Sequence, residues 1–298
     1  HGRTRHVHGH RSREAHPMNG ALSAMKGMIS FFTLWHMDIT QEDMDAMETR
    51  FHMVSVVGLL FGILLIVELG LFYYMYDTVG YGSAMMVAVM AMLTVYVGSK
   101  FLHFDGLTDF GDGMIVSGPP ESHLRALKDT LVGAGGIGVA LAVTLTSFAL
   151  YCSIPWGIAM FLIIPVVEVM VKNGQVFAAS WGIAGKGMAG RQVERTTKAS
   201  AVKSVVLSLV FGLVLCVLAV AMADLVGVRG AVFDTDMFVT IISLLVAGLV
   251  ASAVVGVLMA RVANRNFGMV NGDILGATNE ISRPVIVFAM SLVFVLVI

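Results

Sequence analysis

Three aspartates lie close together in the segment HFDGLTDFGDG at residues 103–113. Asp105, Asp109 and Asp112 are spaced four and three residues apart, which places their carboxylates on one face of a helix. Carboxylates this close repel each other in a poorly hydrated site, and a bound divalent cation relieves the repulsion. Oxygen ligands suit Mg²⁺ or Mn²⁺ better than zinc. We therefore expect a catalytic Mg²⁺ or Mn²⁺ site; the alternative is a solvated helix end.

The residues around this segment suit a phosphate ligand. His103, in the same stretch, is assigned to substrate binding. Downstream, the segment LKDTLVGAGGIG at residues 127–138 leads into an apolar stretch. Backbone N–H groups at a glycine-rich helix start, here beginning at Gly133, bind anions, and Lys128 can pair with a phosphate oxygen. A carboxylate without metal, Asp129 or Asp112, is the candidate general base.

Further polar residues lie within or beside apolar segments. Glu168 and Lys172 are four residues apart in one such segment, and the plain interpretation is an internal ion pair. The alternative is that they form a wall of the active cavity and bind substrate. The segment NGDILGATNE at residues 271–280 places Asp273 and Glu280 seven residues apart beside two glycines. It is a second acidic motif, and both acids are candidates for substrate binding.

The composition shows which elements must position these residues. The chain has 298 residues, of which 57% are hydrophobic and 13% charged, and its mean hydropathy is +0.85. Such values are typical of polytopic membrane proteins. The sequence predicts an all-α bundle with about seven transmembrane helices. The expected spans are residues 53–76, 84–102, 132–153, 156–181, 204–226, 238–260 and 284–298.

The distribution of basic residues predicts the orientation in the membrane. All but two of the 19 Lys and Arg residues fall in residues 1–52, 100–131, 182–203 and 261–283, which alternate with the other loops. Because cytoplasmic loops carry an excess of Lys and Arg, we expect a cytoplasmic N-terminus and an external C-terminus. Both acidic motifs then face the cytoplasm. In the 182–203 loop, Lys186 and Arg191 are candidates to hold phosphates.

The N-terminal region divides into two parts. Residues 1–17 are polar and rich in histidine, and we interpret them as a tag remnant or a disordered leader. Residues 18–298 are expected to form one integral membrane domain. Within it, residues 18–35 are apolar but short and interrupted by glycine, which favours an interfacial or re-entrant helix. An eighth span is the alternative.

The motifs resemble those of a known family. HFDGLTDFGDG, LKDTLVGAGGIGV and NGDILGATNE, in this order and spacing, are similar to the signature segments of cobalamin synthase, the adenosylcobinamide-GDP ribazoletransferase family. The likeness covers most of the chain from Met18 onward. The segments GIAGKGMAGRQVERTT and EVMVKNG depart from the bacterial pattern, which suggests an archaeal-type member and leaves the roles of Glu168 and Lys172 open.

The resemblance implies a magnesium-dependent transferase in the cell membrane with a cytoplasmic active site. It would join adenosylcobinamide-GDP to α-ribazole or its phosphate and release GMP. Its acidic set maps onto Asp105, Asp109, Asp112, Asp129, Asp273 and Glu280. The expected partners are both substrates and the lipid bilayer, without nucleic acid; a homo-oligomer remains open. The alternatives are a metal-dependent phosphotransferase of the CDP-alcohol type and a cation transporter.

Overall fold

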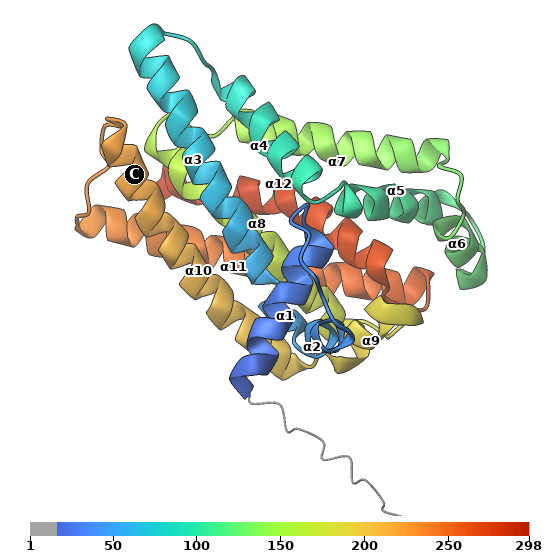
Figure 1. The fold of residues 1–298 in the computed structure, drawn as a ribbon. Helices are drawn as coiled ribbons and strands as arrows, with labels where there is room; N and C mark the ends of the chain where they lie inside the picture. The colour runs from blue at the N-terminus through green and yellow to red at the C-terminus, as the bar shows by residue number, and fades with distance from the viewer. Residues whose placement is uncertain (1–16, 298) are drawn as a thin grey trace, which may run out of the picture.

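The structure is a computed structural model that describes residues 17–297. Within these residues it is all-α, apart from one isolated bridge between Ala184 and Val270. The leader predicted for residues 1–17 lies outside the described residues except for Pro17, which begins the first helix. Figure 1 shows the twelve α-helices and their order. They are α1 (Pro17–Phe32), α2 (Gln41–Thr49), α3 (Ser55–Val79), α4 (Ala84–Gly98), α5 (Leu102–Ile115), α6 (Pro120–Leu127), α7 (Ala134–Cys152), α8 (Ile158–Trp181), α9 (Gly187–Arg195), α10 (Lys198–Leu225), α11 (Thr235–Asn266) and α12 (Gly272–Val297).

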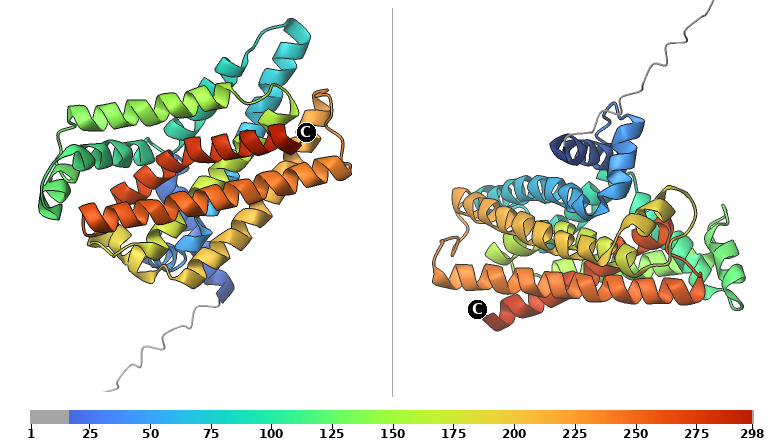
Figure 2. Two further views of the ribbon diagram at one scale, coloured as in Figure 1. Left: turned by 180° about the vertical axis from the view of Figure 1, so that it is seen from behind. Right: turned by 90° about the horizontal axis from the view of Figure 1, so that it is seen from below.

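Six of these helices are long and apolar enough to cross a membrane: α3, α7, α8, α10, α11 and α12. The bent pair α4–α5 makes a seventh candidate span, so the expected all-α bundle with about seven spans is confirmed. The loops that follow α3, α7 and α10 lie at one end, with the end of α12 (Figures 1 and 2). The α5–α7 connection and α9 lie at the other end.

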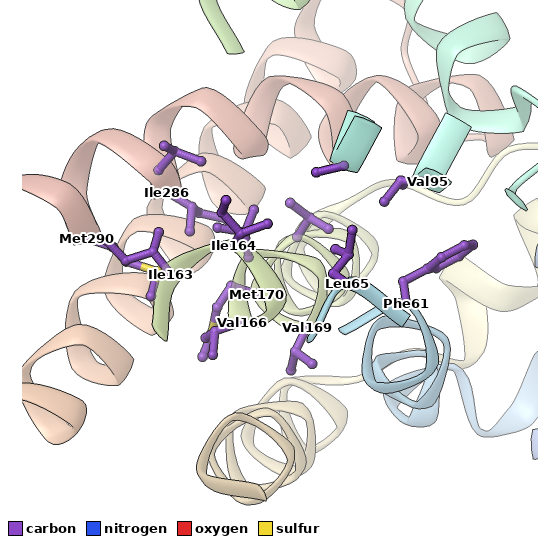
Figure 3. Close-up of a cluster of buried hydrophobic side chains, with 14 of the residues drawn as sticks. Phe61, Leu65, Val95, Ile163, Ile164, Val166, Val169, Met170, Ile286 and Met290 are labelled. Carbon is purple, nitrogen blue, oxygen red and sulfur yellow. The ribbon is translucent and has the colours of Figure 1, made fainter. Parts of the chain in front are cut away.

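Helix α8 is the centre of the bundle. It packs against α3, α10, α11 and α12, and 94% of its span is buried inside the protein. Figure 3 shows side chains of α8, among them Ile164 and Val169, between residues of α3 and α12 such as Leu65 and Ile286. A helix enclosed by protein on all sides can carry polar residues, because neighbouring helices supply their hydrogen-bond partners.

The span predicted for residues 84–102 is broken at its inner end. Helices α4 and α5 are bent by 91° relative to each other. Lys100 and Phe101 form the corner in the left-handed region, with φ of 57° and 56°, which side chains rarely adopt. The bend sends α5 away from the line of α4, so the acidic segment forms a helix of its own.

The C-terminal span begins earlier than predicted. Helix α12 runs without interruption from Gly272 to Val297, whereas the sequence placed residues 261–283 in a loop. Arg283, counted there as a loop residue, is buried in the core. The prediction was wrong because hydropathy treats every charge as exposed to lipid or water, while here Glu168 of α8 and Glu280 pair with the guanidinium.

Short helices cover the inner end of the bundle. Helix α1 has 16 residues and is not among the helices long enough to span; it packs against α2 and α3, which agrees with an interfacial helix. Helix α2 begins with a capping box at Thr40 and Asp43. The Thr40 N–H donates to the Asp43 carboxylate and lowers the pKa of Asp43 to about 2. Lys26 of α1 pairs with the same carboxylate at 3.3 Å.

Candidate active site

The two acidic motifs meet where α5 crosses α12. Gly106 of α5 lies against the backbone of Asp273, so closely that a Cβ atom at Gly106 would lie 2.8 Å from the carbonyl oxygen of Asp273. Gly276 faces the backbone of His103 in the same way, at 3.3 Å. Glycine at both positions lets the helices approach this closely. The structure thus brings together two motifs that are more than 150 residues apart.

The carboxylates at this crossing form an acidic cluster, which we define as Asp105, Asp109 and Asp273. Asp105 and Asp273 both lie close enough to Asp109 for their negative charges to repel its carboxylate. Asp105 repels the carboxylate of Asp273 in the same way. Within the described residues, no protein donor bonds to the side chains of Asp105 or Asp109. Such an accumulation of negative charge favours a cation or a positively charged ligand group.

Asp112 has a different position from the other two aspartates of its motif. Its carboxylate accepts the N–H of Gly133 at 2.6 Å and that of Gly136 at 2.7 Å. These groups belong to the start of α7, where unpaired N–H groups and the helix dipole attract a negative charge. Asp112 therefore holds α7 against α5. The predicted anion site at Gly133 binds this carboxylate of the protein itself.

This contact predicts a contrast between two glycines of α7. A Cβ atom at Gly136 would lie 2.6 Å from the Thr108 carbonyl and 2.7 Å from the Asp112 carboxylate, whereas nothing lies within 4 Å of one at Gly138. Gly136→Leu is expected to separate α5 from α7 and to lower the catalytic activity of the site about tenfold, since overpacking that costs about 1–3 kcal/mol would displace the carboxylates of α5. Gly138→Leu is the control and should keep most of the activity. Equal activities in membranes with equal protein content would contradict this role of the contact.

A pocket opens beside the acidic cluster. The space between its walls, including its open mouth, is about 570 Å³. Asp105 and Asp273 contribute to its wall, as does His103. The remaining walls come from α1, α8, α9, α12 and the turn after α2. The pocket thus lies between the short helices at the inner end and the spans α8 and α12.

Behind the pocket, His103 is connected to the core. Lys172 Nζ lies 2.7 Å from His103 Nε2 and donates to Asn279 Oδ1 at 2.8 Å. Asn279 Nδ2 donates in turn to Glu280 at 2.9 Å. All four residues are buried. Lys172 therefore fixes His103 from behind, which positions the pocket wall, and it does not reach the pocket itself.

The predicted ion pair between Glu168 and Lys172 is wrong. Glu168 pairs with Arg283, and Arg283 also lies 3.5 Å from Glu280. All three side chains are about 1% exposed. Helical spacing alone could not reveal this pairing, because Arg283 comes from another helix. Glu168 and Glu280, assigned to substrate binding from the sequence, thus belong to the buried core of the bundle and are not part of the pocket wall.

The remaining predicted residues are exposed at the surface or pair with another helix. Lys128 is exposed, and its positive charge lies close enough to Asp273 to attract the carboxylate. Asp129 is exposed and accepts the N–H of Leu131 at 3.0 Å. Lys186 is exposed just before α9. Arg191 is engaged elsewhere: its guanidinium donates to both carboxylate oxygens of Glu48 on α2, at 2.6 and 2.8 Å. This pair holds α9 against α2.

Sequence reasoning missed several residues of the site. Gln175 and Gln192 line the pocket, and Asn279 and Arg283 organise the core behind it. Gln175 lies within a predicted span and Gln192 in the 182–203 loop, and neither carries a charge or belongs to an acidic motif that would have pointed to it. The i, i+3 spacing of Glu280 and Arg283 was the one signal that pointed to a buried pair.

These features define a polytopic, all-α membrane protein with an acidic pocket at one end of its bundle. The sequence profile of the cobalamin-5-phosphate synthase family matches residues 24–291. The chain belongs to this family, which confirms the resemblance of its motifs.

Curated relatives cover nearly the whole chain. It is 30% identical to the adenosylcobinamide-GDP ribazoletransferase of Methanocella arvoryzae, over 88% of this chain and 92% of that protein. Proteins of the same name from Methanosarcina mazei and Methanococcoides burtonii are 27% and 24% identical, each over 92% of this chain and over 94% and 93% of their own lengths. No solved structure matches the chain significantly. These comparisons support neither a phosphotransferase of the CDP-alcohol type nor a cation transporter.

Proposed function

We propose that this chain is an adenosylcobinamide-GDP ribazoletransferase. It transfers the cobinamide phosphate moiety to α-ribazole or α-ribazole 5′-phosphate, forms adenosylcobalamin or its 5′-phosphate, and releases GMP. The observation that carries the proposal is the acidic cluster beside the pocket, in a chain of this family. An archaeal type of the enzyme is part of the proposal, because the relatives include archaeal proteins.

The reaction is a phosphoryl transfer. A hydroxyl oxygen of the ribose forms a bond to the phosphorus nearer cobinamide, and the bond from this phosphorus to the bridging oxygen breaks. The bridging oxygen leaves with GMP, and the hydroxyl proton passes to a carboxylate. Asp129 and Asp112 are the candidates for this base. Asp112 already accepts two N–H groups, whereas Asp129 accepts one, which favours Asp129.

Magnesium or manganese is a further part of the proposal. Among the described residues, no three His, Cys, Asp or Glu side chains converge closely enough to hold a metal ion by themselves. Mg²⁺, however, is commonly bound by one or two carboxylates together with substrate phosphates and water. The oxygen ligands of Asp105, Asp109 and Asp273 fit this mode. Bound there, the metal would neutralise charge on the phosphates. Asp112, engaged with α7, fits the ligand role predicted from the sequence less well.

The function is tested directly with isolated membranes. Membranes that contain the chain should release GMP from adenosylcobinamide-GDP after α-ribazole 5′-phosphate is added, and membranes without it should not. The corrinoid product should increase by the same amount as GMP. Substrate hydrolysis without the second substrate, or no turnover with either form of α-ribazole, would argue against a ribazoletransferase.

We also propose that the chain lies in the cell membrane with its active site facing the cytoplasm. The basic segments and the acidic cluster lie at the same end of the bundle, which supports this orientation. In a Cys152→Ser background, an impermeant thiol reagent should label Arg229→Cys in intact cells. It should label Ser117→Cys only after permeabilisation; both positions are exposed. Labelling of Ser117→Cys in intact cells would reverse the orientation.

A further inference from the structure

Two glutamines in the pocket have polar atoms without a partner. Gln175 of α8 and Gln192 of α9 are 1% and 3% exposed, and both line the pocket beside the acidic cluster. In the described part of the chain, Gln175 Oε1 and Gln192 Nε2 are buried without a hydrogen bond. Buried amide groups are nearly always paired, so these two atoms indicate a ligand that completes them.

The orientation of Gln175 is fixed by its second polar atom. Its Nε2 donates to the carbonyl oxygen of Leu275 at 3.0 Å. A carbonyl oxygen can only accept, so the amide cannot be flipped, and Oε1 remains the free acceptor. Gln192 Nε2 is the unpaired donor in this structure. An unpaired acceptor thus lies in the α8 wall of the pocket and an unpaired donor in its α9 wall.

The rest of the wall determines what kind of ligand fits. Phe31, Phe32 and Phe51 contribute aromatic rings, and Met188 adds an apolar side chain. No Lys or Arg lies among the described residues that form the wall, so a phosphate is a poor ligand for this part. A neutral planar ring with a donor and an acceptor on its edge suits both the aromatic wall and the two amides.

We propose that this pocket binds the guanine base of the GDP moiety of adenosylcobinamide-GDP. The inference rests on the proposed function and adds the place of the leaving nucleotide. Guanine N1–H and its amino group can donate to Gln175 Oε1, and guanine O6 can accept from Gln192 Nε2. The phosphates then extend towards Asp105 and Asp273, which belong to the same wall.

Adenine is mismatched at Gln175. It presents an acceptor at N1 and a donor at its 6-amino group, opposite to guanine, and Gln175 cannot flip to adapt. The benzimidazole of α-ribazole carries no adjacent donor and acceptor, so it cannot form hydrogen bonds with both amides. The site therefore selects guanine over adenine. A hydrogen bond of this kind changes affinity by roughly tenfold.

The test is nucleotide binding by the purified full-length protein in detergent with Mg²⁺, measured by equilibrium dialysis of labelled GDP and ADP. Wild type should bind GDP roughly tenfold more tightly than ADP. Gln192→Met, which keeps the length of the side chain, should weaken GDP binding roughly tenfold and leave ADP binding unchanged. Gln175→Met should act in the same way. The matched control is Gln41→Met, because Gln41 is exposed on α2 and, among the described residues, its side chain bonds only to Asp45.

The outcomes separate this inference from the proposed function. Equal binding of GDP and ADP by wild type would overturn the guanine site, as would a Gln192→Met protein that keeps the full preference for GDP. Equal weakening of both nucleotides would also overturn it, because the amides would then hold another part of the substrate. Should Gln175→Met fail to fold, Gln192→Met on the short helix α9 decides. GMP release by wild type is measured separately, so a lost base preference with intact turnover rejects this inference alone.

Discussion

Replacing Asp109 by Asn is expected to lower kcat/KM for GMP release by at least about 100-fold, and to raise the concentration of Mg²⁺ needed for half-maximal activity. The substitution keeps the shape of the side chain but removes one negative charge from a cluster in which Asp105 and Asp273 both lie close to Asp109. EDTA should abolish the activity, and Mg²⁺ or Mn²⁺ should restore it. The measurement is GMP release across a magnesium titration.

Two comparisons sharpen this experiment. Asp38→Asn removes a charge from an exposed position in the loop before α2 and should reproduce the wild-type titration curve. If Asp105 and Asp109 act through one ion, the loss in the double variant Asp105→Asn/Asp109→Asn should be much smaller than the product of the two single losses. Superimposable titration curves for wild type, Asp109→Asn and Asp38→Asn would rule out a metal site at the cluster.

The sequence predicts the helix that carries the aspartates, because helical periodicity is a local property. The spacing of Asp105, Asp109 and Asp112 holds in α5 as expected. Hydropathy likewise finds the apolar segments, since a helix needs about 20 such residues to cross a bilayer. The same reasoning gives no account of which helices touch. That α12 supplies Asp273 to the cluster depends on the close crossing at Gly106 and Gly276.

Pairs between residues far apart in the sequence cannot be predicted for the same reason. Asp112 was assigned to metal binding because its spacing places it on the same helical face as Asp105 and Asp109. Its bonds to Gly133 and Gly136, however, depend on the position of α7. Arg283 was placed in a loop because its charge argued against burial. Its partner Glu168 lies 115 residues away, and no local pattern relates the two.

The buried charged side chains connect the helices that carry the site. Arg283 joins α8 to α12, and Lys172 of α8 contacts both His103 of α5 and Asn279 of α12. The three helices that form the inner wall of the pocket are therefore joined by polar contacts in an apolar surrounding, where such contacts are hard to replace. A pocket whose wall has to hold a phosphoryl donor and an acceptor in line gains rigidity from this arrangement.

Arg283→Met is expected to destabilise the protein by about 3–5 kcal/mol, because it leaves the buried Glu168 and Glu280 without the guanidinium that pairs with them. Thermal unfolding in detergent, monitored by helical circular dichroism and by gel filtration, measures the change in stability. Arg229→Met is the matched control: Arg229 is exposed in the loop between α10 and α11, and surface changes of this kind usually stay within about 0.5 kcal/mol.

The double variant Glu168→Gln/Arg283→Met distinguishes a buried ion pair from a simple packing defect. If the cost of Arg283→Met comes from the unpaired carboxylate, neutralising Glu168 should recover part of the lost stability, although the single change Glu168→Gln is itself destabilising. If the cost comes from lost packing, the two losses should add. Arg283→Met with the thermal stability of Arg229→Met would show that the core does not depend on this cation at all.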